Sequence, residues 1–474
     1  MNADFVDNSA GVDSSDHEVN IKILLNPMVR ERKLELEARN TVLEEMTDTV
    51  ADHVLEHNYD QTLALTIARE NAVGDIDAHE RFMERLEAAG QLDRKVEGLP
   101  SPERIRELKD QGLGLSRPEI AVLISYAKIT LFDKLVASAV PDDPHFTDSL
   151  VTYFPGKLAG YADAMQGHRL KREIIATRLA NDMINLGGPT FLSRAIESTG
   201  GDVDAIARAF EAGRVMFRFK DYTDQINALD NKVSASVQTS LHEEVIRLLR
   251  RQTYWLARRV VGAGNVAIDD IIARFQPGID TLKPLVKSFA SPFDAATITS
   301  SAQAYRAAGA PKALADDVAC LRPLTSSTDV INLASDHNWP LPAAAWLYHA
   351  VGGRFSFDRL RGAGSQLSAA QHWDRLAMRR VIEDLYGSQQ ALTAAIVHFA
   401  VNAGGGLESG IEEPSRDWAQ NLVESWTSAH ADEIDRADRT LDEIVETGTW
   451  TLSKVTICST QLRELAAMAR GSHG

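Results

Sequence analysis

The chain has 474 residues, of which 44% are hydrophobic and 25% are charged, values typical of globular proteins rather than disordered or membrane-embedded ones. Its 67 acidic and 50 basic side chains give a formal net charge of −17, which argues against nucleic acid or an anionic membrane as a principal partner. The two cysteines, Cys320 and Cys458, lie far apart, and neither a signal peptide nor a run of about 18 apolar residues is visible, so a cytoplasmic location is expected.

The first segment, Asp7–Ile23, combines Asn8 with a Gly, three Ser and a cluster of carboxylates. Small residues let the backbone approach a flat ring, and Asn or Ser side chains exchange hydrogen bonds with amides and carboxylates. We therefore interpret the segment as a loop from the end of an active site, which implies that the chain is a fragment. The simpler interpretation is a polar turn that caps the following helix.

Helical patterns follow in chain order. From Pro27 to His57, apolar residues repeat close to the 3.6-residue period, which predicts a helix with Pro27 in its first turn. Two more helices are predicted to start at Ser101 and Ser116, because serine caps free amides and the prolines one or two residues further on fit a first helical turn. Glu119 completes a capping box with Ser116.

Residues 120–140 are apolar on most faces and predict a central core helix. A helix over residues 169–186 is predicted to stop at Gly187, since a left-handed cap and a proline follow it. Beyond Gly262 the helices become shorter, and residues 437–470 form one amphipathic helix or two. Strand-like alternation is scarce, so the sequence predicts an all-α fold with at least about 60% helix and under about 5% strand.

Through Asn8, Gly11, Val12 and Ser15 in the first segment, and through six further segments downstream, the chain resembles the large bacterial NAD-specific glutamate dehydrogenases. In the first segment, Asn8, Gly11, Val12 and Ser15 keep the Asn-Ala-Gly-Gly-Val-x-x-Ser pattern of the smaller glutamate dehydrogenases, while the two residues after Asn8 depart from it. The resemblance is firm to about residue 260 and thinner beyond. The further matching segments are Asn58–Leu65, Gly114–Lys128, Leu179–Asn185, Gly187–Phe191, Gln252–Leu256 and Trp373–Ala377.

This resemblance implies an all-α, multi-helix C-terminal domain with a short remnant of an α/β dehydrogenase domain at its N-terminus. Residues 1–25 would be the end of the catalytic domain, residues 26–265 a helical domain, and residues 266–474 a second helical subdomain.

The resemblance also implies a function. The parent enzyme would interconvert L-glutamate and 2-oxoglutarate plus ammonia with NAD, through a catalytic lysine and aspartate upstream of this chain. No catalytic residue is therefore assigned here, and the chain alone is expected to be inactive and to bind NAD poorly. By resemblance, Asn8 and Gly11 would contact the cofactor, and Val12 and Ser15 the substrate. The remainder would be a scaffold for the catalytic and N-terminal regions of the parent and for homo-oligomer contacts.

Two other classes of function fit parts of the sequence. Residues 26–474 are equally compatible with a free-standing helical interaction module. The residues His53, Glu56 and His57 have the form of an inverted zinc-peptidase motif, which would make the chain a zinc hydrolase. That site needs a third ligand, for which Glu119 or Glu173 are candidates. Because histidines one turn apart are common on solvated helices, we assign no metal ligand.

Two weaker patterns remain. Asp13, Asp16, His17 and Glu18 could hold a divalent ion, but we interpret them as residues that cap and lead the following segment. Gly262–Ala267 has the spacing of a dinucleotide-binding fingerprint. It follows a predicted helix rather than a strand, so it is interpreted as a helix end.

Overall fold

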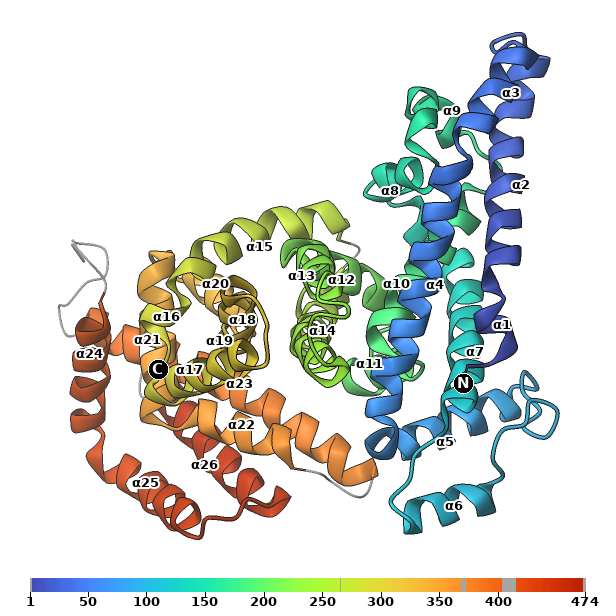
Figure 1. The fold of residues 1–474 in the computed structure, drawn as a ribbon. Coiled ribbons are helices and arrows are strands. Elements are labelled where there is room, and N and C mark those ends of the chain that lie inside the picture. The colour runs from blue at the N-terminus through green and yellow to red at the C-terminus, as the bar shows by residue number, and fades with distance from the viewer. Residues whose placement is uncertain (1, 265, 368–371, 403–414, 472–474) are drawn as a thin grey trace. The chain divides into compact units, whose positions relative to one another are not determined.

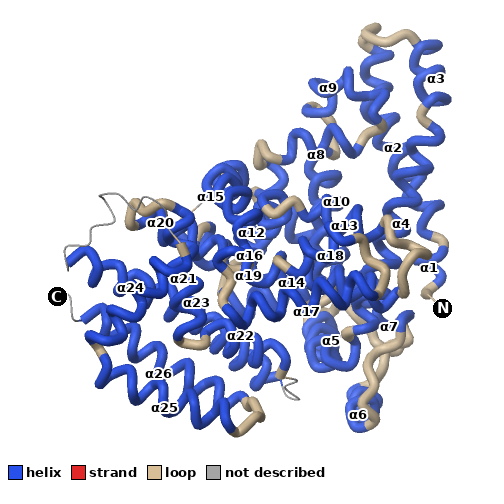
Figure 2. Tube along the Cα trace, turned by 60° about the vertical axis from the view of Figure 1, so that its left-hand side comes forward, coloured by secondary structure: helices blue, strands red, loops and turns tan. Residues whose placement is uncertain are grey.

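The fold of the protein is all-α. The computed structural model describes residues 2–264, 266–367, 372–402 and 415–471, and every regular element within these ranges is a helix (Figures 1 and 2). Helices account for 81% of the structure. The predicted fold class and the predicted helix content are therefore confirmed.

The helices have the following bounds. In the first part of the chain they are α1 Asp4–Asp7, α2 Ser9–Arg30, α3 Leu36–Glu45, α4 Thr47–Glu70, α5 Ala72–Ala88, α6 Pro102–Asp110, α7 Arg117–Val136, η1 Val140–Asp142, α8 Phe146–Tyr153, η2 Gly156–Tyr161, α9 Ala162–Gln166, α10 Lys171–Gly187, α11 Phe191–Thr199, α12 Val203–Met216, α13 Phe219–Asn227 and α14 Ala235–Arg259. They continue with η3 Val261–Ala263, α15 Ile268–Leu282, η4 Lys283–Leu285, α16 Val286–Phe289, α17 Pro292–Ala307, α18 Lys312–Ala319, α19 Leu321–Leu324, α20 Ser327–Asp336, α21 Leu341–Arg354, α22 Phe357–Gln366, α23 His372–Asn402, α24 Arg416–Ala429, α25 Ala431–Glu446 and α26 Leu452–Gly471.

The chain divides into two compact units. The first unit contains Met1–Gly213 and Thr253–Ile271, and the second contains Arg214–Gln252 and Ile272–Gly474. In the first unit, α4, α7 and α10 pack against one another, and α2 packs on α4 (Figure 1). Helix α7 is the central element expected from its apolar sequence, because Ile120, Leu123, Leu131 and Leu135 are all fully buried.

Local sequence signals determine several helix ends. The Ser101 side chain accepts a hydrogen bond from the Arg104 amide at 3.2 Å, where α6 begins. At the start of α7, Glu119 accepts a hydrogen bond from the Ser116 amide at 2.6 Å, and the capping box is complete. Helix α10 ends at Gly187, and Gly188 follows with a φ of 81°, which glycine adopts readily. These three predictions are confirmed.

The N-terminal segment differs from its prediction. Residues 9–30 form the continuous helix α2, so the interpretation of Asp7–Ile23 as a loop is wrong. The helix buries its side chains at a spacing of three or four residues, namely His17, Asn20, Ile21, Leu24 and Leu25. The internal Gly11 lowers the stability of the helix by only about 1 kcal/mol, and the burial of these five side chains offsets this loss.

The prediction of one helix from Pro27 to His57 is also wrong. Pro27 lies in the last turn of α2 rather than in a first turn, and the chain then turns through residues 31–35. Arg32 has a φ of 59°, a left-handed conformation that ends the helix. The predicted segment therefore comprises the end of α2, all of α3 and the first part of α4.

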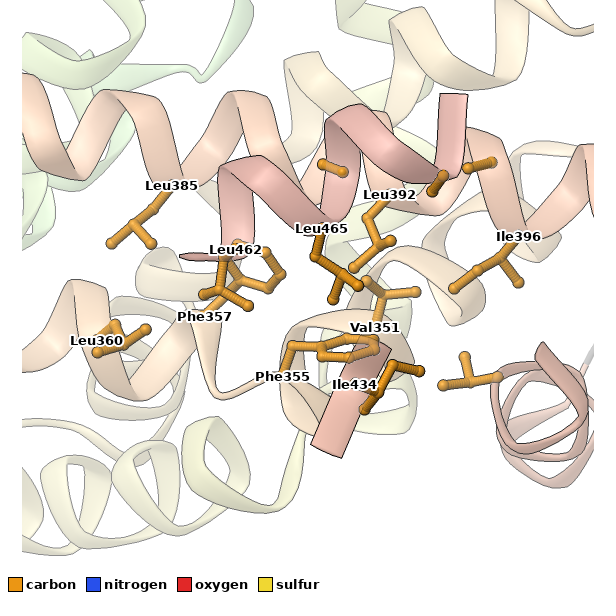
Figure 3. Packing of buried hydrophobic residues seen from close by; sticks show 14 of the residues in the cluster. Val351, Phe355, Phe357, Leu360, Leu385, Leu392, Ile396, Ile434, Leu462 and Leu465 are labelled. Carbon is orange, nitrogen blue, oxygen red and sulfur yellow. The ribbon is translucent and has the colours of Figure 1, made fainter. Parts of the chain in front are cut away.

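The second unit has its own apolar core, shown in Figure 3. Helices α21 to α26 contribute to it, with Val351, Phe357, Leu392 and Leu462 among the buried side chains. The core forms because α23 and α26 carry apolar residues at helical spacing and pack side by side. The predicted amphipathic tail consists of two helices, α25 and α26.

Two further observations concern the hydropathy of the helices and the state of the two cysteines. Among the described residues, no helix is both long enough and apolar enough to cross a membrane. Cys320 and Cys458 are free and buried.

Candidate functional site

Four polar side chains meet where α2 packs on α4. Asp13 and His17 lie one turn apart on α2, and His53 and His57 lie one turn apart on α4. His57 Nδ1 is 2.8 Å from Asp13 Oδ2, and His17 Nε2 is 4.0 Å from Asp13 Oδ1. The His17 ring is stacked on the His57 ring at 5.8 Å and lies 5.6 Å from the His53 ring. We refer to Asp13, His17 and His57 as the histidine–aspartate triad.

His17 is the buried member of this triad. Its side chain is 1% exposed, and neither ring nitrogen has a hydrogen-bond partner. One face of the ring is stacked on Tyr153 of α8, with ring centroids 4.8 Å apart. Burial lowers the pKa of His17, because the charged imidazolium would lose its hydration. Burial therefore favours the neutral imidazole over the charged imidazolium.

A hydrogen-bond network lies beside the triad. The Tyr153 hydroxyl donates to Asp16 at 2.8 Å and accepts from the Asn20 amide at 2.8 Å. His168 Nε2 donates to the backbone carbonyl of Asn20 at 3.1 Å. Burial is the main cause that raises the pKa of Tyr153, so the phenol stays protonated and remains a donor. The network ties α2 to α8 and to the loop before α10.

The two histidines of α4 differ in their electrostatics. The hydrogen bond with Asp13 raises the pKa of His57, because the carboxylate stabilises the imidazolium. Burial instead lowers the pKa of His53. His57 is about half exposed, with 47% of its side chain accessible, and Asp13 is 24% exposed. The triad therefore has one buried member and two that reach solvent.

The residues expected to contact cofactor and substrate lie on the other side of α2. Asn8 lies between α1 and α2, and Gly11, Val12 and Ser15 lie within α2 itself. All four are exposed, and 76% of Val12 is accessible. Gly11 and Ser15 are four residues apart and Val12 is three residues before Ser15, so these three share one face of α2, and Asn8 lies just before the helix begins.

Two exposed apolar residues extend this outward surface. Val19, seven residues after Val12 on α2, and Phe5, in the short preceding helix α1, are each 47% exposed. We refer to the surface of Phe5, Asn8, Val12, Ser15 and Val19 as the outer face of α2. It lies opposite the side that carries His17 and Asn20.

The alternative zinc-hydrolase motif contributes one residue to the side chains that could hold a metal ion. Within the part of the chain that the structure describes, the group of three side chains suited to a metal is Asp13, His17 and His57, which includes His57 but neither His53 nor Glu56. The suggested third ligand Glu119 is used in the capping box of α7.

The capping role expected for the acidic N-terminal cluster is wrong, because its four residues lie inside α2 and not before it. Asp16 accepts hydrogen bonds from Tyr153 and Asn20, and Glu18 pairs with Lys22 one turn later.

Sequence reasoning missed the triad because its halves are 44 positions apart. The available signal was the shared helical spacing of Asp13 and His17.

Family models match most of the chain. The model described as "Glutamate dehydrogenase, C-terminal" matches residues 112–464, and the model described as "Bacterial NAD-glutamate dehydrogenase, catalytic domain" matches residues 1–68. The second match contains α1, α2, α3 and most of α4, and therefore the triad and the outer face of α2.

Curated relatives match the chain over its whole length. Proteins named NAD-specific glutamate dehydrogenase from Halomonas elongata, Pseudomonas aeruginosa and Mycobacterium tuberculosis are 36%, 35% and 31% identical to it, and each alignment covers 100% of this chain. The chain spans 28% of the length of each of these relatives. The chain belongs to the family of the bacterial NAD-specific glutamate dehydrogenases, whose C-terminal model matches most of its length.

Proposed function

We propose that this chain is the helical C-terminal part of an NAD-dependent glutamate dehydrogenase, and that it acts as a scaffold rather than as the catalyst. The parent enzyme would convert L-glutamate, NAD and water to 2-oxoglutarate, ammonia and NADH. The observation that carries the proposal is the match of the whole chain to proteins named NAD-specific glutamate dehydrogenase, of which it spans 28%.

The fold supports the division of labour. A dinucleotide fold binds its cofactor at the ends of parallel strands, with the pyrophosphate at a helix N-terminus. The described parts of this chain contain helices and no strand. The Gly262–Ala267 pattern follows α14, a helix, and Asn265 lies outside the described residues. Hydride transfer would therefore depend on the catalytic region of the parent.

The outer face of α2 is the proposed contact with that catalytic region. Asn8 and Gly11 would lie at the nicotinamide, and Val12 and Ser15 at the substrate. An isolated helix gains nothing from presenting Phe5, Val12 and Val19 to water, whereas burying an exposed valine or phenylalanine contributes about 1.5–3 kcal/mol. The face is thus suited to being covered by another part of the parent.

The same proposal extends to assembly and location. The helical units would pack on the catalytic and N-terminal regions of the parent, contribute to contacts between copies in a homo-oligomer, and work in the cytoplasm. The free-standing interaction module remains the competing class of function. The genomic sequence upstream of Met1 distinguishes them, because only the proposal requires a continuous reading frame that encodes a catalytic domain.

Activity measurements test the scaffold role. The purified chain and the parent protein are assayed for NADH formation with glutamate and NAD. We expect activity from the parent and none from the chain. NADH formation by the chain alone would contradict the proposal.

Variants of the parent test the outer face. Asn8→Ala is expected to raise KM for NAD, and Val12→Ala and Ser15→Ala to raise KM for glutamate. Ser14→Ala is the matched control, since Ser14 is an exposed serine of α2 that points away from the outer face. Unchanged kinetics in all three variants would remove the site assignment while leaving the family membership intact.

A further inference from the structure

We propose that Asp13, His17 and His57 form a binding site for a divalent transition metal ion, with Zn²⁺ as the ion that fits best. The proposal departs from the sequence-based expectation of no metal ligand. It also differs from the zinc-hydrolase motif, because His17 of α2 replaces His53 of α4 as the second imidazole.

The donor set is the first argument. Two imidazole nitrogens and one carboxylate oxygen form a ligand set that zinc sites use, with an open fourth position for water. One ligand atom from each residue can be chosen so that all three lie within 4.8 Å of one another. An ion with ligands at about 2.0–2.2 Å draws them to roughly 3.4 Å apart, so binding requires side-chain shifts of about 1 Å.

The second argument is independent of the spacing and concerns His17. Its ring is 1% exposed, and both nitrogens lack a hydrogen-bond partner. A buried polar atom without a partner is unfavourable, and native structures contain few of them. A metal ion between His17 and Asp13 would give one nitrogen its missing partner.

The surroundings suit a bound ion as well. The Tyr153 ring stacks on His17 at 4.8 Å and fixes the orientation of the imidazole from behind. His57 is 47% exposed and Asp13 24%, so an ion can enter from solvent on that side and retain a water ligand. The ion would connect α2 with α4 directly behind the outer face of α2.

Zinc binding to the 474-residue chain, purified without a histidine tag and dialysed against a chelator, tests the site. Calorimetric titration with Zn²⁺ is expected to give one ion per chain. Thermal unfolding should show a higher Tm with Zn²⁺ bound. Mg²⁺ prefers oxygen ligands and should not compete with Zn²⁺ for the site. His57→Gln and Asp13→Asn are expected to weaken zinc binding at least about tenfold, since each removes a ligand. Both residues reach solvent, so these variants should fold normally, as circular dichroism will show.

His53→Gln is the matched control, because it removes a neighbouring histidine of α4 that is outside the triad. Its zinc affinity should stay close to that of the unchanged chain. Co²⁺ provides a second readout, with visible absorption bands that appear in the unchanged chain and in His53→Gln but are lost in His57→Gln. Absence of stoichiometric zinc binding overturns the proposal. So does full zinc affinity in both His57→Gln and Asp13→Asn, or an equal loss in His53→Gln.

Discussion

The phenol of Tyr153 donates a hydrogen bond to Asp16 at 2.8 Å across 137 positions of the chain. This contact, with the Asn20 amide that donates to the same phenol oxygen, joins α8 to the buried side of α2. It also keeps the Tyr153 ring against His17.

Replacing Tyr153 with Phe keeps the ring stacking and removes both hydrogen bonds. Because the buried Asn20 amide then loses a partner, we expect the free energy of unfolding to fall by about 1–3 kcal/mol. Urea denaturation measures the change. Tyr161→Phe, at a partly exposed tyrosine of the same unit, is the control and should change stability by less than about 0.5 kcal/mol. Equal effects of the two substitutions would contradict the prediction.

Gly114 is predicted to tolerate no side chain. A Cβ at this position would overlap the backbone and side chain of Ala72 at the start of α5. Gly114→Ala should therefore lower stability by about 1–3 kcal/mol, the usual cost of overpacking. Gly74→Ala is the matched control, since a Cβ there meets open space within α5, and it should raise stability by about 0.5–1 kcal/mol. Thermal unfolding compares the two, and a Tm decrease in Gly74→Ala alone would refute the packing argument.

Gln252 is fully buried and makes two hydrogen bonds in the second unit. Its amide donates to the Thr325 carbonyl at 2.9 Å, and its carbonyl accepts from the Thr328 hydroxyl at 3.0 Å. Gln252→Leu keeps a similar volume but leaves both partners unpaired, so we expect a loss of about 2–4 kcal/mol in urea denaturation. The exposed Gln225→Leu should lose less than about 0.5 kcal/mol. A loss below about 1 kcal/mol in Gln252→Leu would show that these hydrogen bonds contribute little.

His79 should make stability depend on pH. Burial in α5 lowers its pKa from 6.5 to about 4, so between these values the unfolded chain binds a proton that the folded chain does not. The stabilisation is complete above pH 6.5 and decreases as the pH falls toward 4, by up to about 3 kcal/mol.

Unfolding measured across this pH range in His79→Leu should have a shallower pH dependence than in the unchanged chain. Other buried histidines with lowered pKa values, such as His17, His242 and His349, contribute to the slope that remains. An identical slope in the variant would contradict the assignment. His430→Asn, at a partly buried histidine of α24–α25, serves as the control.

Local signals could be predicted from the sequence, and contacts distant in the chain could not. The starts at Ser101 and Ser116 and the stop at Gly187 depend on neighbouring residues alone. The loop prediction for residues 7–23 failed because Asn, Gly and Ser lower helix propensity only slightly, whereas the helical spacing of Ile21, Leu24 and Leu25 lets α2 bury one side.

The triad shows why the site could be foreseen only in part. The i, i+4 pairs Asp13–His17 and His53–His57 are both visible in the sequence, but which residue of one pair faces which of the other depends on how α2 packs on α4.

The structure also explains two segments that carry the family resemblance. Gly114 contacts Ala72, and Gly187 leaves room for the Phe191 ring.

The continuity of α2 restricts how this region can change in length. The helix runs without interruption from Ser9 to Arg30, with the outer face on one side and His17 on the other. Inserting or deleting one residue between Val12 and His17 would rotate the two faces by about 100° relative to each other. Either the outer face or His17 would then point in the wrong direction. Related chains are therefore expected to differ in length at the turn of residues 31–35. Within α2 they are expected to differ only by substitution.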